Sequence, residues 1–250
     1  MSVAQAVTSL LPHENIVYVA DTAYAPYGEK TDAVIYQRMH AITQFLLDMQ
    51  VKAIVVACNT ATTSSIDKLR AKYTMPIIGV EPGVKPAVLA SKTRVVGVLA
   101  TPRTLQTLAF STLAQRFAAD AKIVLQPCPE WVSRIEALDL HSEPMRGLLK
   151  HTLQPLLQQD VDTLVLGCTH YNFIAEAIAD IVGPHINIIR TELAVAQQLK
   201  HKLSETGLLA EMDNTVKHRF YTSGSLDVFK QQLRYLWPQT TLDAVRSVMV

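Results

Sequence analysis

Short runs of β-branched and other apolar residues recur along the chain, and stretches with helical spacing separate them. The runs are continuously apolar rather than alternating, which is typical of strands buried on both faces of a sheet. Each run therefore predicts a strand, and the runs lie at 16–20, 53–57, 76–80, 94–99, 122–126, 163–167 and 186–189.

The intervening stretches carry apolar residues at the spacing of a core-facing helical stripe. The clearest stripe steps by four, three and four residues, through Ile35, Met39, Ile42 and Leu46. Two later stretches continue this spacing, at Ile66, Leu69 and Tyr73 and at Ile174, Ile178 and Ile181. Alternation of strands and helices predicts an α/β fold with a mainly parallel sheet flanked by helices.

Two segments of the chain, 54–60 and 164–170, share one arrangement. In each, an apolar strand ends in a cysteine, Cys58 or Cys168, and leads into a helix. The carboxyl ends of parallel strands are where open α/β sheets bind ligands. The shared arrangement suggests two related halves, and prolines and a glycine at 82–86 indicate a boundary between lobes there.

Composition narrows the classes of protein. The chain has 250 residues, 49% of them hydrophobic, so a folded protein is expected. Its formal net charge is only +1, so the composition does not indicate an electrostatic field that would attract nucleic acid or an anionic membrane. No apolar run is long enough to cross a membrane, and the start lacks the pattern of a secretory signal. Three widely separated cysteines are a poor disulfide framework and favour a reducing cytosol.

A lone cysteine at a strand end is more often a small buried hydrophobe than a catalyst. Two at matching strand–helix junctions favour a functional role, because the partial positive charge of a helix N-terminus favours a thiolate. Both are followed by residues that can cap a helix or bind an anion, namely Asn59 and Thr60, then Thr169 and His170. Cys128 stands between two prolines and is interpreted as structural.

Three kinds of chemistry fit cysteines in this pattern. A metal site is disfavoured, because the chain has no CxxC and Cys168-Thr169-His170 is tight spacing for joint chelation. Acyl transfer by one cysteine with His170 and a carboxylate leaves the other cysteine without a role. Two-base proton transfer, with a base on one face of a carbon and an acid on the other, uses both thiols.

The sequence resembles the glutamate racemase family along almost its whole length, with the motifs in the expected order. The matching segments are Tyr18-Val19-Ala20-Asp21-Thr22 with Pro26-Tyr27-Gly28, Ala57-Cys58-Asn59-Thr60-Ala61-Thr62, Gly79-Val80-Glu81-Pro82, Ala100-Thr101-Pro102-Arg103-Thr104, Cys128-Pro129 with Glu136, Gly167-Cys168-Thr169-His170-Tyr171, and Tyr221-Thr222-Ser223-Gly224 with Phe229.

This resemblance implies two pseudo-symmetric α/β lobes, with the active site between them. The expected organisation is a first lobe at 1–82, a second at 83–191, and a segment at 192–250 that packs back on the first. The implied activity is cofactor-independent interconversion of L- and D-glutamate in the bacterial cytoplasm, supplying D-glutamate for peptidoglycan. Glutamate is the expected partner, nucleic acid and membrane are not, and a homodimer is an assembly that the sequence leaves open.

The resemblance also assigns roles to residues. Cys58 and Cys168 would be the acid/base thiols, with His170 and Glu136 tuning the second. Residues expected to bind substrate are Tyr27, Gly28, Asn59, Thr60, Thr101, Thr104, Thr169 and His170. Taken alone, Tyr27 and Gly28 would be interpreted as a turn, and Glu136 as a solvated charge.

Two departures from the family pattern stand out. Its apolar first strand and Asp-Ser-Gly-x-Gly-Gly motif have no counterpart, so we expect a late start site and a strand missing inside the first-lobe sheet. Arg190-Thr191 stand where the family usually has Asp-Ser, and altered packing or regulation is expected there. The alternatives left open are an aspartate racemase or other two-cysteine relative, and a catalytically impaired protein that binds acidic amino acids.

Overall fold

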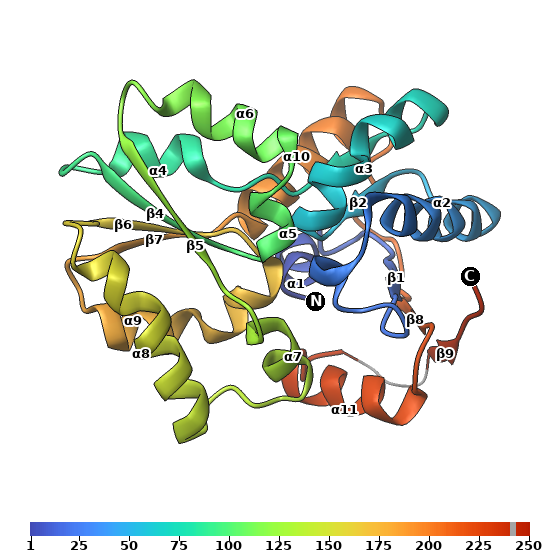
Figure 1. Ribbon diagram of the computed structural model, residues 1–250. Coiled ribbons are helices and arrows are strands. Elements are labelled where there is room, and N and C mark those ends of the chain that lie inside the picture. The colour runs from blue at the N-terminus through green and yellow to red at the C-terminus, as the bar shows by residue number, and fades with distance from the viewer. Residues whose placement is uncertain (241–243) are drawn as a thin grey trace. The chain divides into compact units, whose positions relative to one another are not determined.

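A computed structural model describes residues 1–240 and 244–250 (Figure 1). The chain folds into two compact units: residues 1–80 with 192–250, and residues 81–191. Each is an α/β unit in which all paired strands run parallel. Parallel pairing aligns the carboxyl ends of neighbouring strands at one edge of a sheet, and the residues that follow these ends form the candidate site.

The first unit holds two sheets. One has the order β1 (Val17–Ala20), β8 (Arg219–Thr222) and β9 (Val245–Ser247), and the other pairs β2 (Ile54–Val56) with β3 (Ile77–Gly79). Neither β8 nor β9 was predicted as a strand, because both are short and mix apolar with polar residues.

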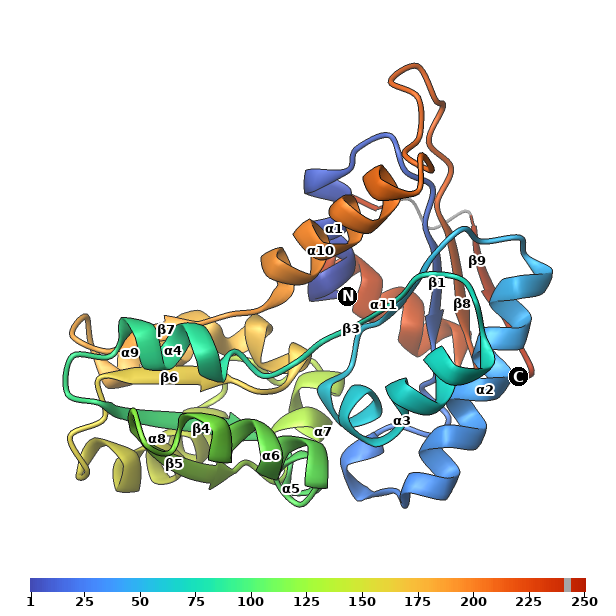
Figure 2. The same cartoon turned by 90° about the horizontal axis from the view of Figure 1, so that it is seen from above.

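Helices cover both faces of these sheets (Figure 2). On one face, α1 (Ser2–Leu10) and α10 (Glu192–Glu205) pack against each other and against β3. On the other, α2 (Asp32–Asp48) and α3 (Asn59–Lys72) enclose a second core cluster. A third cluster joins α11 (Leu226–Leu236) to the first sheet.

Strands β1 and β2 contact one core cluster, although they lie in different sheets. Val17 and Val19 of β1 pack against the same cluster as Ile54 and Val56 of β2. Within residues 1–240 and 244–250, the sheet pairings join β1 only to β8 and β2 only to β3. That a strand of the family's first-lobe sheet is missing from this chain stays a prediction.

The second unit contains one sheet of order β5-β4-β6-β7. Its strands are β4 (Val95–Ala100), β5 (Lys122–Pro127), β6 (Thr163–Leu166) and β7 (Asn187–Ile189). The helices that flank it or follow its strands are α4 (Val84–Ala90), α5 (Pro102–Leu105), α6 (Leu108–Phe117), α7 (Trp131–Glu136), α8 (Glu143–Leu157), the 3₁₀ helix η2 (Thr169–Ile174) and α9 (Ala175–Val182). Alternate residues of β4 point to opposite faces: Val96 and Val98 contact the cluster of α4 and α6, whereas a Cβ at Gly97 would meet Leu156 of α8.

One detail of the burial pattern was predicted wrongly. All strands were expected to be buried on both faces, yet β5, which lies at the edge of its sheet, exposes Lys122 and Leu125. In α2 the predicted stripe is confirmed, because Met39 packs against the cluster that holds Ile35, Ile42 and Leu46, but Arg38 is buried on this side as well. A charged residue on the core side of a helix requires a partner, and that partner belongs to the candidate site.

Among the described residues, no helix is long and apolar enough to span a membrane.

Candidate active site

Cys58 lies where β2 ends and α3 begins. It is the N-cap residue of α3, and its Sγ accepts a hydrogen bond from the backbone N–H of Ala61 at 3.5 Å. Thr62 holds this junction, because its hydroxyl donates to the Val56 carbonyl and accepts from the Val80 backbone N–H. The half-exposed thiol therefore lies at the positive end of a 14-residue helix, where an anionic sulfur is favoured.

The two residues after Cys58 are buried in the first turn of α3. Asn59 and Thr60 are 2% and 3% exposed. The Asn59 side-chain amide donates to the Val80 carbonyl at 3.2 Å. Within the described part of the chain, its Oδ1 is buried without a hydrogen-bond partner. A buried unpaired acceptor is unfavourable unless a ligand pairs with it, so this oxygen is suited to a substrate N–H group.

Tyr27 and Gly28 lie in the short 3₁₀ helix η1 (Tyr27–Glu29), which contacts α3. The Tyr27 hydroxyl donates to the carboxylate of Asp21 at 2.5 Å. Arg38 binds the same carboxylate through Nε and Nη2, at 2.9 and 2.8 Å. Burial opposes ionisation of Asp21, but the hydrogen bonds from Arg38, Tyr27 and Ser223 hold its pKa below the ordinary value of 3.8.

Cys168 occupies the corresponding junction of the second unit, between β6 and η2, and is 7% exposed. Its Sγ lies 3.8 Å from Nδ1 of His170, whose Nε2 lies 2.6 Å from Oε1 of Glu136. Burial alone would lower the pKa of His170, but the hydrogen bonds to Cys168 and Glu136 outweigh it and raise the pKa to about 9. His170 is therefore a cation at neutral pH, placed between a thiol and a carboxylate.

Gly167, Thr101 and Thr104 lie beside this junction. The N–H of Gly167 donates to the Leu99 carbonyl at 2.7 Å, and a Cβ there would approach that oxygen to 2.8 Å. Thr101 follows β4, the neighbour of β6, so it lies at the same sheet edge as Cys168. It caps α5, and its hydroxyl lies 3.0 Å from that of Thr104; both side chains are buried.

The third cysteine has a structural environment. Cys128 is 1% exposed, and its Sγ donates to the Gln126 carbonyl at 3.4 Å. Burial raises the pKa of this thiol well above its ordinary value. Its carbonyl accepts from the hydroxyl of Tyr171, so the residue ties the end of β5 to η2.

The structure thus gathers the predicted residues into two groups, one in each unit. The first unit brings together Tyr27, Gly28, Cys58, Asn59 and Thr60, and the second brings together Thr101, Thr104, Glu136, Cys168, Thr169 and His170. Sequence reasoning missed Asp21 and Arg38, which anchor Tyr27. The available signal was Arg38, a charged residue three positions after Ile35 and four before Ile42 on the apolar side of α2.

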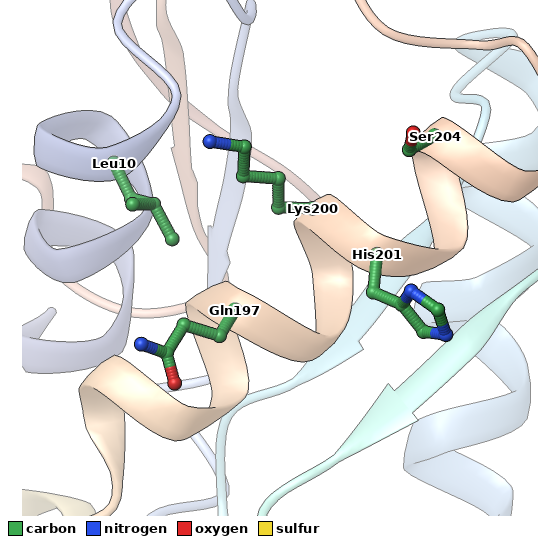
Figure 3. Close-up of a pocket in the computed structure, with 5 residues that line it drawn as sticks. All are labelled: Leu10, Gln197, Lys200, His201 and Ser204. Atoms are coloured by element: carbon green, nitrogen blue, oxygen red, sulfur yellow. The ribbon is translucent and has the colours of Figure 1, made fainter.

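None of these residues lines the surface hollow beside α1 and α10 (Figure 3). That hollow is lined by Leu10, Gln197, Lys200, His201 and Ser204. Among residues 1–240 and 244–250, no three His, Cys, Asp or Glu side chains gather as a set able to hold a metal ion.

Comparison with known proteins identifies the family. Residues 1–199 match the family model described as Asp/Glu/Hydantoin racemase. The chain is 45% identical over 238 residues to a glutamate racemase of Methylococcus capsulatus, covering 95% of this chain and 88% of that protein.

Two solved structures similar to this chain are glutamate racemases. Glutamate racemase isoform RacE1 of Bacillus anthracis superposes with a TM-score of 0.90 at 29% identity, covering 100% of this chain and 93% of that one. Glutamate racemase of Francisella tularensis, solved in complex with D-glutamate, gives 0.86 at 29% identity over 99% and 92% of the two chains. The chain belongs to the Asp/Glu/Hydantoin racemase family and is an amino-acid racemase, an isomerase.

Proposed function

We propose that this protein interconverts L- and D-glutamate without a cofactor, with Cys58 and Cys168 as the acid/base pair. The observation that carries the proposal is the matched placement of the two thiols, each at the carboxyl end of a parallel strand and at the start of a helical segment. The identity to glutamate racemases supports glutamate as the substrate. We further propose that the reaction takes place in the bacterial cytoplasm and supplies D-glutamate for peptidoglycan.

In the proposed reaction, one cysteine thiolate removes the α-proton and becomes a thiol. The electron pair of the broken C–H bond passes to the α-carbon and is delocalised into the substrate carboxylate. The thiol of the other cysteine then delivers a proton to the opposite face of that carbon and becomes a thiolate. One proton is taken and one is given, so the product is the mirror-image amino acid and the two thiols have exchanged roles.

The neighbours of each thiol suit this division of work. Asn59 offers its unpaired Oδ1 to the substrate ammonium group, and Thr60 and the N–H groups of the first turn of α3 are placed to bind the carboxylate. On the second thiol, the His170 cation stabilises the thiolate, and Glu136 orients the imidazole. We assign Tyr27, Gly28, Thr101, Thr104 and Thr169 to substrate binding.

The test is racemisation of L-glutamate compared with L-aspartate, followed by chiral separation. The expected result is formation of D-glutamate, with L-aspartate turned over far more slowly. A preference for aspartate would reassign the substrate. Glutamate binding without any turnover would instead indicate a protein that only binds acidic amino acids.

A further inference from the structure

The carboxylate of Asp21, the first residue after β1, is the centre of a hydrogen-bond network that the proposed reaction does not use. Oδ2 accepts from Tyr27 at 2.5 Å and from Arg38 Nε at 2.9 Å. Oδ1 accepts from Arg38 Nη2 and from the Ser223 hydroxyl, each at 2.8 Å. The Asp21 side chain is 7% exposed and that of Arg38 is 10% exposed, so this is a buried ion pair with its acceptors occupied.

A buried ion pair is weak evidence for stability, because desolvation of the two charges offsets most of their attraction. Arg38 takes a core-facing position of α2 between Ile35 and Ile42, where an apolar residue would pack without that cost. Its guanidinium also stacks on the Tyr24 ring at 3.8 Å and donates to the backbone oxygen of Val250. The network is therefore better explained by what it holds in place than by a gain in stability.

What the network holds is the loop that carries Tyr27. The loop is tied to the end of β8, because Thr22 and Thr222 hydroxyls lie 2.7 Å apart and the Ala23 N–H donates to Ser223. From there the loop leads to η1, which contacts α3, and Tyr27 packs against the same core cluster as Cys58. The phenol is thereby held close enough to Cys58 for the two groups to interact electrostatically.

The Tyr27 hydroxyl is also fixed in its protonation state. Burial and the hydrogen bond to the Asp21 carboxylate raise the pKa of Tyr27 far above its ordinary value of 10.0. Because its proton is committed to Asp21, Tyr27 does not compete with the thiol for the substrate α-proton. Tyr27 instead offers the substrate a rigid ring, an oxygen lone pair and the adjacent backbone.

We propose that Asp21 and Arg38 form a positioning pair that fixes Tyr27 and Gly28 beside Cys58, and so controls substrate affinity rather than proton transfer. This rests on the proposed function for its substrate. Neither side chain needs to touch the substrate. Loss of the pair leaves Tyr27 free to move, and the misplacement weakens binding in the ground state and the transition state alike.

The experiment compares Asp21→Asn, Tyr27→Phe and the double variant in the full chain, with steady-state kinetics on L-glutamate. We expect Asp21→Asn to lower kcat/KM by roughly 100-fold, mostly through a higher KM. If Asp21 acts through Tyr27, then adding Asp21→Asn to Tyr27→Phe changes KM by less than about two-fold, because coupled residues are not additive. Multiplied losses in the double variant would overturn the proposal.

A second readout does not depend on turnover. Alkylation of Cys58 by iodoacetamide, followed by mass spectrometry of its peptide, reports how the loop shields the thiol. Asp21→Asn and Arg38→Met should both accelerate this alkylation, and unchanged rates in both would contradict the positioning role. If the wild-type protein does not racemise glutamate, the proposed function fails while this readout still decides the positioning claim.

The matched control is Asp162→Asn. Asp162 is another multiply hydrogen-bonded carboxylate, but it precedes β6 at the end of the sheet opposite Cys168. The Asp162→Asn variant should lower Tm without altering KM or Cys58 alkylation.

If Asp21→Asn fails to fold, Ser223→Ala is the alternative variant. It removes one hydrogen bond from Asp21 and should raise KM by about three-fold, with the same non-additivity toward Tyr27→Phe. An unchanged KM in a folded Ser223→Ala protein would contradict the proposal.

Discussion

The two cysteine junctions share a backbone plan but differ in their electrostatic surroundings. Cys58 is half-exposed and caps a regular α-helix, with the neutral Tyr27 and the self-compensated pair of Asp21 and Arg38 nearby. Cys168 is buried, starts a 3₁₀ helix, and has the His170 cation 3.8 Å from its sulfur. At Cys58 the positive charge near the sulfur is the partial charge at the N-terminus of a long helix. At the buried Cys168, which precedes a short 3₁₀ helix, it is the full charge of a neighbouring side chain.

Racemisation should fall most when either of the two thiols is removed. Cys58→Ala and Cys168→Ala should each lower racemisation by about 10³-fold or more, since each removes one partner of a two-base transfer. Cys128→Ala is the matched control: that buried cysteine has no proposed part in proton transfer, so the variant should retain catalysis. Near-normal racemisation by either of the first two variants would refute the pairing.

A second variant, Glu136→Gln, tests the role of the His170 cation, which is present only at the Cys168 junction. Glu136→Gln removes the carboxylate next to Nε2 and should lower the pKa of His170 from about 9. We expect kcat/KM to fall by about 10- to 100-fold, as for loss of an orienting carboxylate elsewhere, and the basic limb of its pH profile to move to lower pH. The exposed Glu130→Gln serves as control. An unshifted pH profile would mean that Glu136 does not act on His170.

The residue before each cysteine differs between the junctions. A methyl group is present at Ala57, but at Gly167 a Cβ would meet the Leu99 carbonyl oxygen at 2.8 Å and the Ala100 Cβ at 3.0 Å. Both contacts involve atoms at or next to the main chain, so Gly167→Ala should destabilise the protein by about 1–3 kcal/mol. Gly147→Ala, in α8 with no atom within 4 Å of the added Cβ, should instead stabilise it by about 0.5–1 kcal/mol. Urea denaturation measures both, and equal effects would refute the steric argument.

The smallest effect is the pH dependence of stability, which should have opposite signs at the two junctions. The pKa of His170 is raised from 6.5 to about 9 in the folded protein, so its contribution is present below pH 6.5 and is lost as pH rises through 9. The pKa of Asp21 is lowered from 3.8, so its contribution is present above that value and is lost as pH falls through the folded pKa. The Tm difference between wild type and His170→Asn should therefore vanish in alkali, and that for Asp21→Asn in acid. Persistence of both differences across pH would contradict these assignments.

Sequence patterns predicted much of the fold because apolar runs report burial directly. Where burial was partial the patterns failed: β8 and β9 are short and mixed, and β5 exposes its outer side. The two cysteine junctions were recognisable because each is a local strand–helix boundary.

The partners of those junctions were harder to find. His170 and Glu136 are separated by α8 and β6 along the chain and meet only through the fold. Asp21, Arg38 and Ser223 come from three distant segments. Only the buried charge on the apolar side of α2 gave any local sign of that network.

In the proposed mechanism two different thiols act on one α-carbon. The most direct test of this mechanism is racemisation of L-glutamate in deuterated water, stopped after a small fraction of conversion and analysed by chiral separation and mass spectrometry. We predict deuterium at Cα of the D-glutamate formed and almost none in the remaining L-glutamate, because the base that removes a proton is not the acid that delivers the next one. Equal early labelling of both enantiomers would show that a single group serves both faces, and would contradict the two-thiol mechanism.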